Sequence, residues 1–418
     1  MMQLPLYLDN HSTTQVDPRV VEAMLPYFTE VFGNAGSSTH VFGHAAKKVV
    51  EGAREKIAAS VGAVSREIVF TSGATESNNL AIRGVAERLG EKGRHIVSVA
   101  TEHPSVLEPL EKLGRRGFEI TLLPVIPAGN ERAGCIDPER VAEAIRPDTI
   151  LVSAMLANNE IGAIHPLAEI GRICKERGVL LHSDATQAVG KIAVDVERLK
   201  VDLMSFSAHK IYGPKGTGAL YVRKTGRRVK LESQIDGGGQ ESGIRSGTLN
   251  VPGIVGFAKA LELCMIDLPG EQNRLLTMRN RLFEGITAEL SGVSLNGPAI
   301  TQSILTGQSN NSPLPLGEGP GVRAEYRLPG NLNLSFDKVD GETLLIKMPE
   351  IALSSGSACS SATPEPSHVL RALGVSNETA RGSIRFGLGR FNTPDEVEYV
   401  IRRVIETVTS LRKMIDLE

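Results

Sequence analysis

The stretch VDLMSFSAHK, residues 201–210, is the clearest guide to the fold. It begins as the apolar run of a buried β-strand and ends in small polar residues, a histidine and a lysine. Similar strand-like runs alternate with longer helical stretches from about Val64 to Arg223. This alternation predicts right-handed crossovers, and therefore an α/β fold with a mostly parallel sheet covered by helices on both faces. Ligands of such sheets bind beyond the carboxyl ends of the strands, where Lys210 falls.

Helix-start signals separate the strand-like runs from one another. Asp137 and Pro138 form a helix start, with an acid at the N-cap and proline at the first helical position. Further helices are expected from Thr75 and from Pro104. The expected strands are Glu67–Phe70, His95–Val99, Glu119–Val125, Thr149–Met155, Val179–His182, Val201–Phe206 and Gly218–Val222.

The C-terminal part reads as a separate α+β unit. A glycine-rich loop, Asp236–Thr248, and a helix from Pro252 to about Cys264 precede it. Strands are expected at Asn331–Phe336 and Ser383–Phe386, and the last helix opens on a capping box, Thr393 to Glu396, and runs to about Lys413. The run Thr301–Arg327 is rich in Pro, Gly, Ser and Asn and predicts a disordered surface insertion. A partner-docking loop is the alternative, but no residue in the run favours it.

Composition excludes several classes of protein. The formal net charge is −2, aromatic residues make up 4% and tryptophan is absent, which disfavours nucleic acid and anionic membranes as partners. No apolar run approaches the ~20 residues of a membrane span, and no secretory signal is visible, so we expect a cytoplasmic protein. The four cysteines lack a CxxC pairing and therefore predict neither a disulfide framework nor a structural zinc site.

Three strand ends could carry chemistry together. Lys210 can form an imine with a carbonyl, and pyridoxal phosphate is the common carbonyl for that chemistry. Asp184, in the run HSDATQ at 182–187, could hold the proton on a pyridinium nitrogen. The run TSGATES at 71–77 leads from a strand into a helix, whose N-terminal N–H groups bind phosphate readily. Taken singly, the alternatives are a surface lysine, a helix N-cap and a plain helix start.

These motifs resemble those of fold-type I pyridoxal-phosphate enzymes, and several more resemble cysteine desulfurases of the NifS/IscS type. The resemblance spans nearly the whole chain and breaks only around 301–327. It departs from the family pattern at Leu156-Ala157 and at Ala35-Gly36. The matching motifs are YLDNHSTT (7–14), TSGATESNN (71–79), TEH (101–103), NNEIG (158–162), DATQ (184–187), SAHK (207–210), RSGT (245–248), SSGSAC (354–359), EPS (365–367) and VLRALG (369–374).

The resemblance implies a large domain at 16–264 with a mostly parallel seven-stranded sheet, and a small domain made of 1–15 and 265–418. It also implies a role for each matching residue. Lys210 would bind the cofactor covalently and act as base at the substrate's α-carbon, and His103 would stack on the cofactor ring and shuttle protons. Arg385, with Asn159, would bind the substrate carboxylate. The remaining cofactor-binding residues would be Ala74, Thr75, Asn159, Asp184, Gln187, Ser207, His209 and Thr248, with Thr248 reaching the phosphate of a second subunit in a homodimer.

Cys359 carries the distinguishing chemistry of the resemblance. Small polar residues surround it, which predicts an exposed, mobile loop whose thiolate can attack sulfur. The implied reaction takes sulfur from L-cysteine, leaves L-alanine and places a persulfide on Cys359. The sulfur then passes to an acceptor such as an iron–sulfur scaffold protein, and Cys359 could touch a transferred cluster. No resident metal is expected, and Cys135, Cys174 and Cys264 read as small buried hydrophobes.

Other functions stay open at this point. A selenocysteine lyase, or another fold-type I enzyme such as a small-substrate aminotransferase, would use the same cofactor site, but an aminotransferase has no use for the Cys359 loop. A sulfur-transfer adaptor without catalysis would have lost Lys210, Asp184 or His103, and all three are present. The sequence does not identify the sulfur acceptor.

Overall fold

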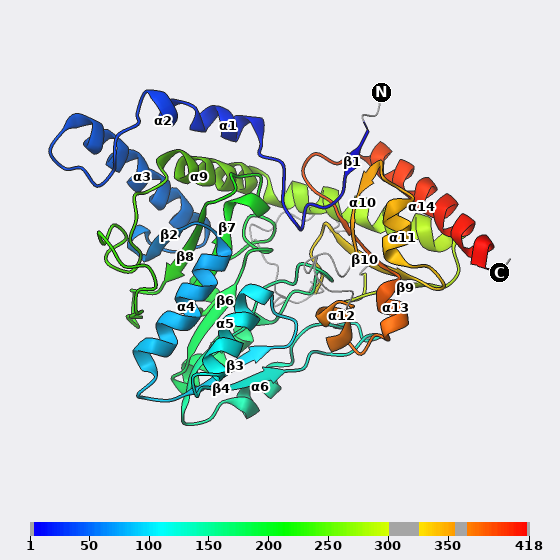
Figure 1. Ribbon diagram of the computed structural model, residues 1–418, viewed down its shortest axis with the longest axis horizontal. Coiled ribbons are helices and arrows are strands. Elements are labelled where there is room, and N and C mark those ends of the chain that lie inside the picture. Colours follow the sequence, from blue (N-terminus) through cyan, green and yellow to red (C-terminus); the bar gives the residue numbers. More distant parts are fainter. Residues whose placement is uncertain (1–3, 301–325, 356–365, 416–418) are drawn as a thin grey trace, which may run out of the picture.

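The computed structural model describes residues 4–300, 326–355 and 366–415 (Figure 1). Two sheets organise this part of the chain, and a short parallel pair of strands joins its N-terminal end to the second sheet. Within these ranges, no helix is long and apolar enough to cross a membrane. Cys359 and most of the predicted insertion at 301–327 lie outside the described residues.

The first sheet has seven strands in the order β2-β8-β7-β6-β5-β3-β4. Only β8 runs antiparallel to its neighbours, so the prediction of a mostly parallel seven-stranded α/β sheet is confirmed. The sequence placed β3 and β8 at their observed limits and the others within a few residues. The strands are β2 (Ile68–Thr71), β3 (His95–Val99), β4 (Glu119–Leu123), β5 (Thr149–Ser153), β6 (Leu180–Asp184), β7 (Leu203–Ser207) and β8 (Gly218–Val222).

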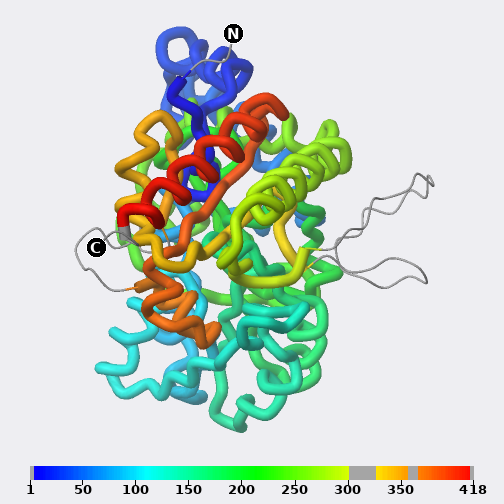
Figure 2. Tube along the Cα trace, turned by 90° about the vertical axis from the view of Figure 1, so that its right-hand side faces the viewer, coloured from blue at the N-terminus to red at the C-terminus, as the bar shows by residue number. Residues whose placement is uncertain are grey.

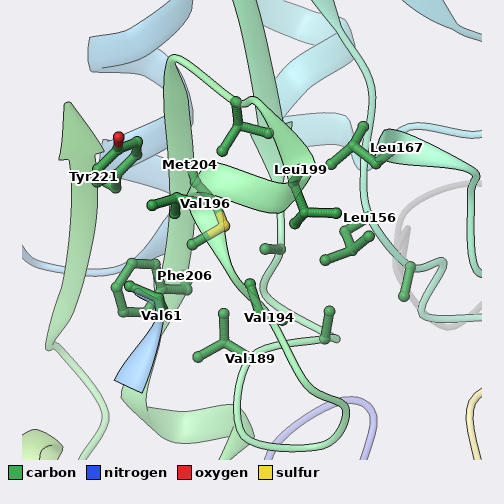
Figure 3. Packing of buried hydrophobic residues seen from close by; sticks show 14 of the residues in the cluster. Val61, Leu156, Leu167, Val189, Val194, Val196, Leu199, Met204, Phe206 and Tyr221 are labelled. Atoms are coloured by element: carbon green, nitrogen blue, oxygen red, sulfur yellow. The ribbon is translucent and has the colours of Figure 1, made fainter. Parts of the chain in front are cut away.

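Helices cover both faces of this sheet. Alternate side chains of the strands enter two separate cores, because successive residues of a strand point to opposite faces. One core holds Ile96, Leu151 and Leu203 against α4 (Ala74–Leu89) and α5 (Pro104–Gly114). The other core holds Met204, Phe206 and Tyr221, part of which Figure 3 shows. The helices of this second face are α3 (Val41–Ser60), α6 (Pro138–Ala144), α7 (Leu167–Arg177), α8 (Val196–Leu199) and α9 (Val251–Ile266), and α1 (Pro18–Met24) and α2 (Pro26–Thr29) lie beside α9.

The second sheet has four antiparallel strands in the order β12-β13-β10-β9. Its core contains Leu332, Phe386 and Val404 and is separate from the cores of the first sheet. Two long helices, α10 and α14, lie side by side over it (Figure 2). The elements are β9 (Val293–Leu295), β10 (Asn331–Phe336), β12 (Ser354–Ser355), β13 (Ser383–Gly387), α10 (Leu268–Glu289), α11 (Gly341–Ile346) and α14 (Pro394–Ile415).

Two segments link the sheets. β1 (Leu6–Tyr7) pairs in parallel with β11 (Ile351–Ala352), so the N-terminal residues join the second sheet's side of the molecule (Figure 1). Helix α12 (His368–Ala372), followed by α13 (Asn377–Arg381), places Leu370 in the core of the first sheet. The predicted domain limits of 15/16 and 264/265 stay a prediction. Helix α12 belongs by sequence to the predicted small domain, but it packs on the core of the first sheet.

Local signals in the sequence account for several helix starts. Asp137 caps α6 by accepting a hydrogen bond from Glu139 N at 3.1 Å, with Pro138 at the first position, as predicted. The predicted capping box of α14 is also present. Glu396 Oε2 accepts from Thr393 N at 3.2 Å, and Thr393 Oγ1 accepts from Glu396 N at 3.3 Å. Such reciprocal bonds satisfy N–H groups that a helix leaves without partners.

Candidate functional site

The predicted site residues converge at the carboxyl ends of the parallel strands. β7 leads into a 3₁₀ turn, Ala208–Lys210, and β6 ends at Asp184. His103 and Asn159 follow β3 and β5, which run in the same direction as β6 and β7. The register of parallel strands therefore brings residues from distant positions to one edge, as open α/β sheets do.

Lys210 is held by the N-terminal segment. Its Nζ donates to the backbone oxygens of His11 at 2.7 Å and Ser12 at 2.5 Å. Residues 7–14 matched the family only as a motif, which predicted no role for them. Their conspicuous run of polar residues, DNHSTT, was the available signal.

Asp184 is buried at the end of β6, with 6% of its surface exposed. Asn78 Nδ2 donates to its Oδ2 at 2.7 Å, and Thr186 N donates to its Oδ1 at 2.9 Å. The alternative role as a helix N-cap does not apply, because the next α-helix, α8, begins only at Val196. A buried carboxylate with one acceptor bond on each oxygen retains the capacity to bind a cationic ring N–H, so it fits a pyridinium partner.

His103 is the N-cap of α5. Its Nδ1 accepts a hydrogen bond from Ser105 N at 3.1 Å, and Ser105 Oγ lies 2.8 Å from the same atom. Burial lowers the pKa of His103, while the charge of Asp184 opposes this shift. The ring is therefore neutral near pH 7, and because Nδ1 accepts from a backbone N–H, its proton sits on Nε2.

A buried carboxyl group lies directly before His103. Burial raises the pKa of Glu102 well above 4.5, and the charge of Asp184 adds to the rise. Glu102 Oε1 accepts from Met155 N at 2.5 Å. Burial thus favours the protonated form of Glu102, a residue that sequence reasoning did not single out.

The start of α4 fits a phosphate. Gly73 is the N-cap with a φ of +153°, and it has no side chain to cap the first turn. Ser207 Oγ would lie 3.7 Å from a Cβ added at Gly73, so the end of β7 borders the helix start. Ala74 opens the helix, and Thr75 is exposed at its first turn. Uncapped N–H groups with a neighbouring hydroxyl suit an oxyanion.

His209 directly precedes Lys210 in the 3₁₀ turn after β7. Its Nδ1 is 3.1 Å from Thr13 Oγ1. Burial, together with the charges of the nearby Lys210 and Lys215, lowers the pKa of His209 to about 4. The imidazole is neutral at pH 7, so it would meet a phosphate as a hydrogen-bonding ring and not as a cation.

Gln187 is held at both ends of its amide. Its Nε2 donates to His11 O at 2.9 Å, and its Oε1 accepts from Lys191 Nζ at 2.7 Å and lies 3.0 Å from His11 Nδ1. Burial, with the charge of Lys210, lowers the pKa of Lys191 to about 7. Sequence reasoning predicted Gln187 but missed both His11 and Lys191.

Arg385 reaches the site from β13 of the second sheet. Its Nη2 donates to Asp9 Oδ1 at 2.7 Å and to Ser12 Oγ at 2.6 Å, and its Nη1 donates to Asn159 O at 3.2 Å. The arginine is 3% exposed, and its Nε is buried without a hydrogen-bond partner among the described residues. Asp9 is a further site residue that the sequence reading did not predict.

Two predicted residues are not brought to this cluster. Thr248 is exposed in the glycine-rich loop after β8. Cys359 lies outside the described residues, although β12, just before it, pairs Ser354 with Arg385. The other three cysteines are buried as predicted, and burial raises the pKa of Cys135 and Cys174 to about 12. In the described ranges, no group of three or more His, Cys, Asp or Glu side chains could hold a metal ion.

Comparisons with known proteins agree on one family. The model of the class-V aminotransferases matches residues 6–308. Cysteine desulfurase IscS of Anaeromyxobacter dehalogenans is 52% identical over 413 residues, 99% of this chain and 95% of that protein. The IscS of Methylococcus capsulatus is 48% identical with 99% and 94% coverage.

Solved structures give the same picture. A NifS-like protein superposes with a TM-score of 0.83 at 37% identity, covering 97% of this chain and 99% of the other. A structure described as SspA in complex with cysteine gives a TM-score of 0.76 at 34% identity, with 93% and 100% coverage.

Proposed function

The chain belongs to the class-V aminotransferase family and is a cysteine desulfurase, and we propose that the residues around Lys210 remove sulfur from L-cysteine with pyridoxal phosphate as cofactor. One observation carries the assignment of residues. Lys210 Nζ and Arg385 Nη2 both bond to Ser12, at 2.5 Å and 2.6 Å. The lysine that can form an imine with the cofactor and the arginine that can bind a carboxylate thus meet at one residue, so a substrate carboxylate on Arg385 would lie near the imine.

The residues present would divide the binding of the cofactor among them. Lys210 would hold it covalently, Asp184 would keep the proton on its ring nitrogen, and His103 would stack on the ring. Bound there, pyridoxal phosphate supplies an aldehyde that links to amines and a ring that accepts electrons from bonds at the α-carbon. Its phosphate would lie against the groups at the start of α4 and the end of β7, namely Ala74, Thr75, Ser207 and His209, and its ring oxygen against Asn159 and Gln187.

The chain's own groups would then act on the substrate. Arg385 would bind the carboxylate of L-cysteine, and the Lys210 amine would take the proton from the α-carbon. The Cys359 thiolate would attack the substrate sulfur. An S–S bond forms while the C–S bond breaks, and its electron pair stays on carbon. With one proton, that carbon becomes the methyl group of L-alanine, and a second proton returns to the α-carbon. Cys359 then carries the persulfide to an acceptor such as an iron–sulfur scaffold protein.

A homodimer in the cytoplasm belongs to the same proposal. The exposed Thr248 would reach the phosphate of the second subunit. Large apolar side chains around α2 and the start of α3 are also exposed, Phe28 at 59%, Phe32 at 63% and Val41 at 74%. Exposed apolar patches of this kind mark contacts with another protein.

The decisive experiment compares Cys359→Ser with the wild type and with Cys174→Ser, which alters a buried thiol on α7. Alanine and sulfide are measured with pyridoxal phosphate, L-cysteine and a thiol reductant. Cys359→Ser should keep the visible-to-near-ultraviolet absorption of the bound cofactor but lose at least about 99% of sulfide release, because the sulfur has no thiolate to accept it. Release at the wild-type rate from Cys359→Ser would refute its role.

A further inference from the structure

Asp9 forms an ion pair with Arg385, the arginine that the proposed function assigns to the substrate carboxylate. Asp9 Oδ1 accepts from Arg385 Nη2 at 2.7 Å, and the two side chains are 18% and 4% exposed. The same oxygen accepts from Ser354 Oγ at 2.7 Å. Asp9 is thereby fixed from two sides, and Arg385 has a carboxylate partner within its own chain.

The donors of Arg385 are unevenly used. Both N–H groups of Nη2 are engaged, one by Asp9 and one by Ser12. Nε is buried and has no hydrogen-bond partner in the described part of the chain. Nε and Nη2 form the edge of a guanidinium that grips a carboxylate with two parallel bonds. A ligand carboxylate that binds this edge would find the Nε donor unused, but it completes the second bond only by replacing an oxygen of Asp9 or Ser12.

The charge of Asp9 also affects the binding of a carboxylate to Arg385. A carboxylate that approaches an unpaired arginine is attracted by a full positive charge, whereas one that approaches the Arg385–Asp9 pair meets little net charge. The pair is poorly accessible to water, so solvent screens this difference weakly. Asp9 therefore lowers the affinity of Arg385 for any carboxylate, and a ligand must gain the rest of its affinity elsewhere in the site.

We propose that Asp9 is a specificity-determining residue that keeps simple carboxylates from filling the substrate site. L-cysteine compensates with its amino group, which the Lys210 side of the site can bind, whereas a carboxylate without an amino group has no second anchor. This inference rests on the proposed role of Arg385. It assigns Asp9 a function beyond orienting Arg385, because Ser12 Oγ and Asn159 O already hold the guanidinium.

The test uses Asp9→Asn in the holoenzyme. Asparagine has the shape of aspartate and keeps an oxygen for Arg385 and Ser354, so mainly the charge is removed. The matched control is Glu350→Gln, because Glu350 Oε1 also accepts from an arginine, Arg403 Nε, at 2.7 Å but outside the site. Propionate is the probe, since it carries a carboxylate and no amino group, and calorimetry measures its binding without turnover.

We expect Asp9→Asn to bind propionate about tenfold more tightly and to lower KM for L-cysteine by a similar factor, with kcat changed less than about threefold. Glu350→Gln should match the wild type in both. An affinity for propionate that is unchanged or weaker in Asp9→Asn overturns the proposal, as does binding of propionate to neither protein. Propionate binding by a wild type that makes no alanine from cysteine would instead refute the proposed function and leave the role of Asp9 standing.

Discussion

Lys191 shows how one partly buried residue makes the stability of the protein depend on pH. Its pKa falls from 10.5 to about 7, first because burial disfavours the ammonium form and then because Lys210 is near. Between these values the unfolded chain binds more protons than the folded chain. The contribution of Lys191 to the free energy of unfolding therefore rises as pH increases through this window, and it is fully unfavourable below about pH 7.

Replacing Lys191 by Met should remove that dependence. From pH 7 to pH 9 the free energy of unfolding of the wild type should gain up to about 1.4 kcal/mol per pH unit relative to Lys191→Met. Urea unfolding at both pH values measures the difference. Lys56→Met, which alters a solvent-exposed lysine paired with Glu262, is the control and should follow the wild type. Equal pH dependence in Lys191→Met and the wild type would contradict the prediction.

At the scale of elements, two glycines on helices differ in what surrounds them. A Cβ added at Gly285 of α10 would lie 2.6 Å from Ile401 Cδ1 of α14, whereas a Cβ at Gly52 of α3 would have no atom within 4 Å. Gly285→Ala should lower the free energy of unfolding by about 1–3 kcal/mol through overpacking. Gly52→Ala should raise it by about 0.5–1 kcal/mol, because alanine favours the helix. Chemical denaturation measures the free energy of unfolding of both variants. A change of the same sign in both would contradict the prediction.

The strands and helices were predictable where the pattern is local. Apolar runs located β3 and β8, and cap residues located α6 and α14, because neighbouring residues supply those interactions. The order of the strands, the reversed direction of β8 and the packing of α12 on the first sheet were not predictable. They depend on contacts between residues far apart in the chain, which no local pattern records.

The residues of the candidate site were likewise predictable only in part. Lys210 and Asp184 stand at strand ends, so their convergence follows from the parallel sheet. Asp9, His11 and Lys191 have partners that other elements supply, and only the folded chain identifies them.

At the scale of the whole molecule, the exposed aromatic residues around α2 and α3 predict assembly. The rings of Phe32 and Phe42 lie 5.5 Å apart and both residues are more than half exposed. Replacing Phe28 and Phe32 together by Asp should weaken the proposed homodimer by at least about a hundredfold, since charge replaces buried apolar surface. Sedimentation velocity across a dilution series measures this. Unaltered sedimentation would place the dimer contact elsewhere.

The N-terminal segment has a consequence for how the protein is made. Leu6 pairs with Ile351, and Asn10 N donates to Gly387 O at 3.1 Å. A ribosome that adds about 5–20 residues per second needs roughly 20–70 s to travel between those partners. The segment that supports Lys210 thus leaves the ribosome well before Ile351 and Gly387, with which it pairs. A nascent chain that already contains the whole seven-stranded sheet still lacks Arg385, which contacts Ser12, and therefore lacks a complete site.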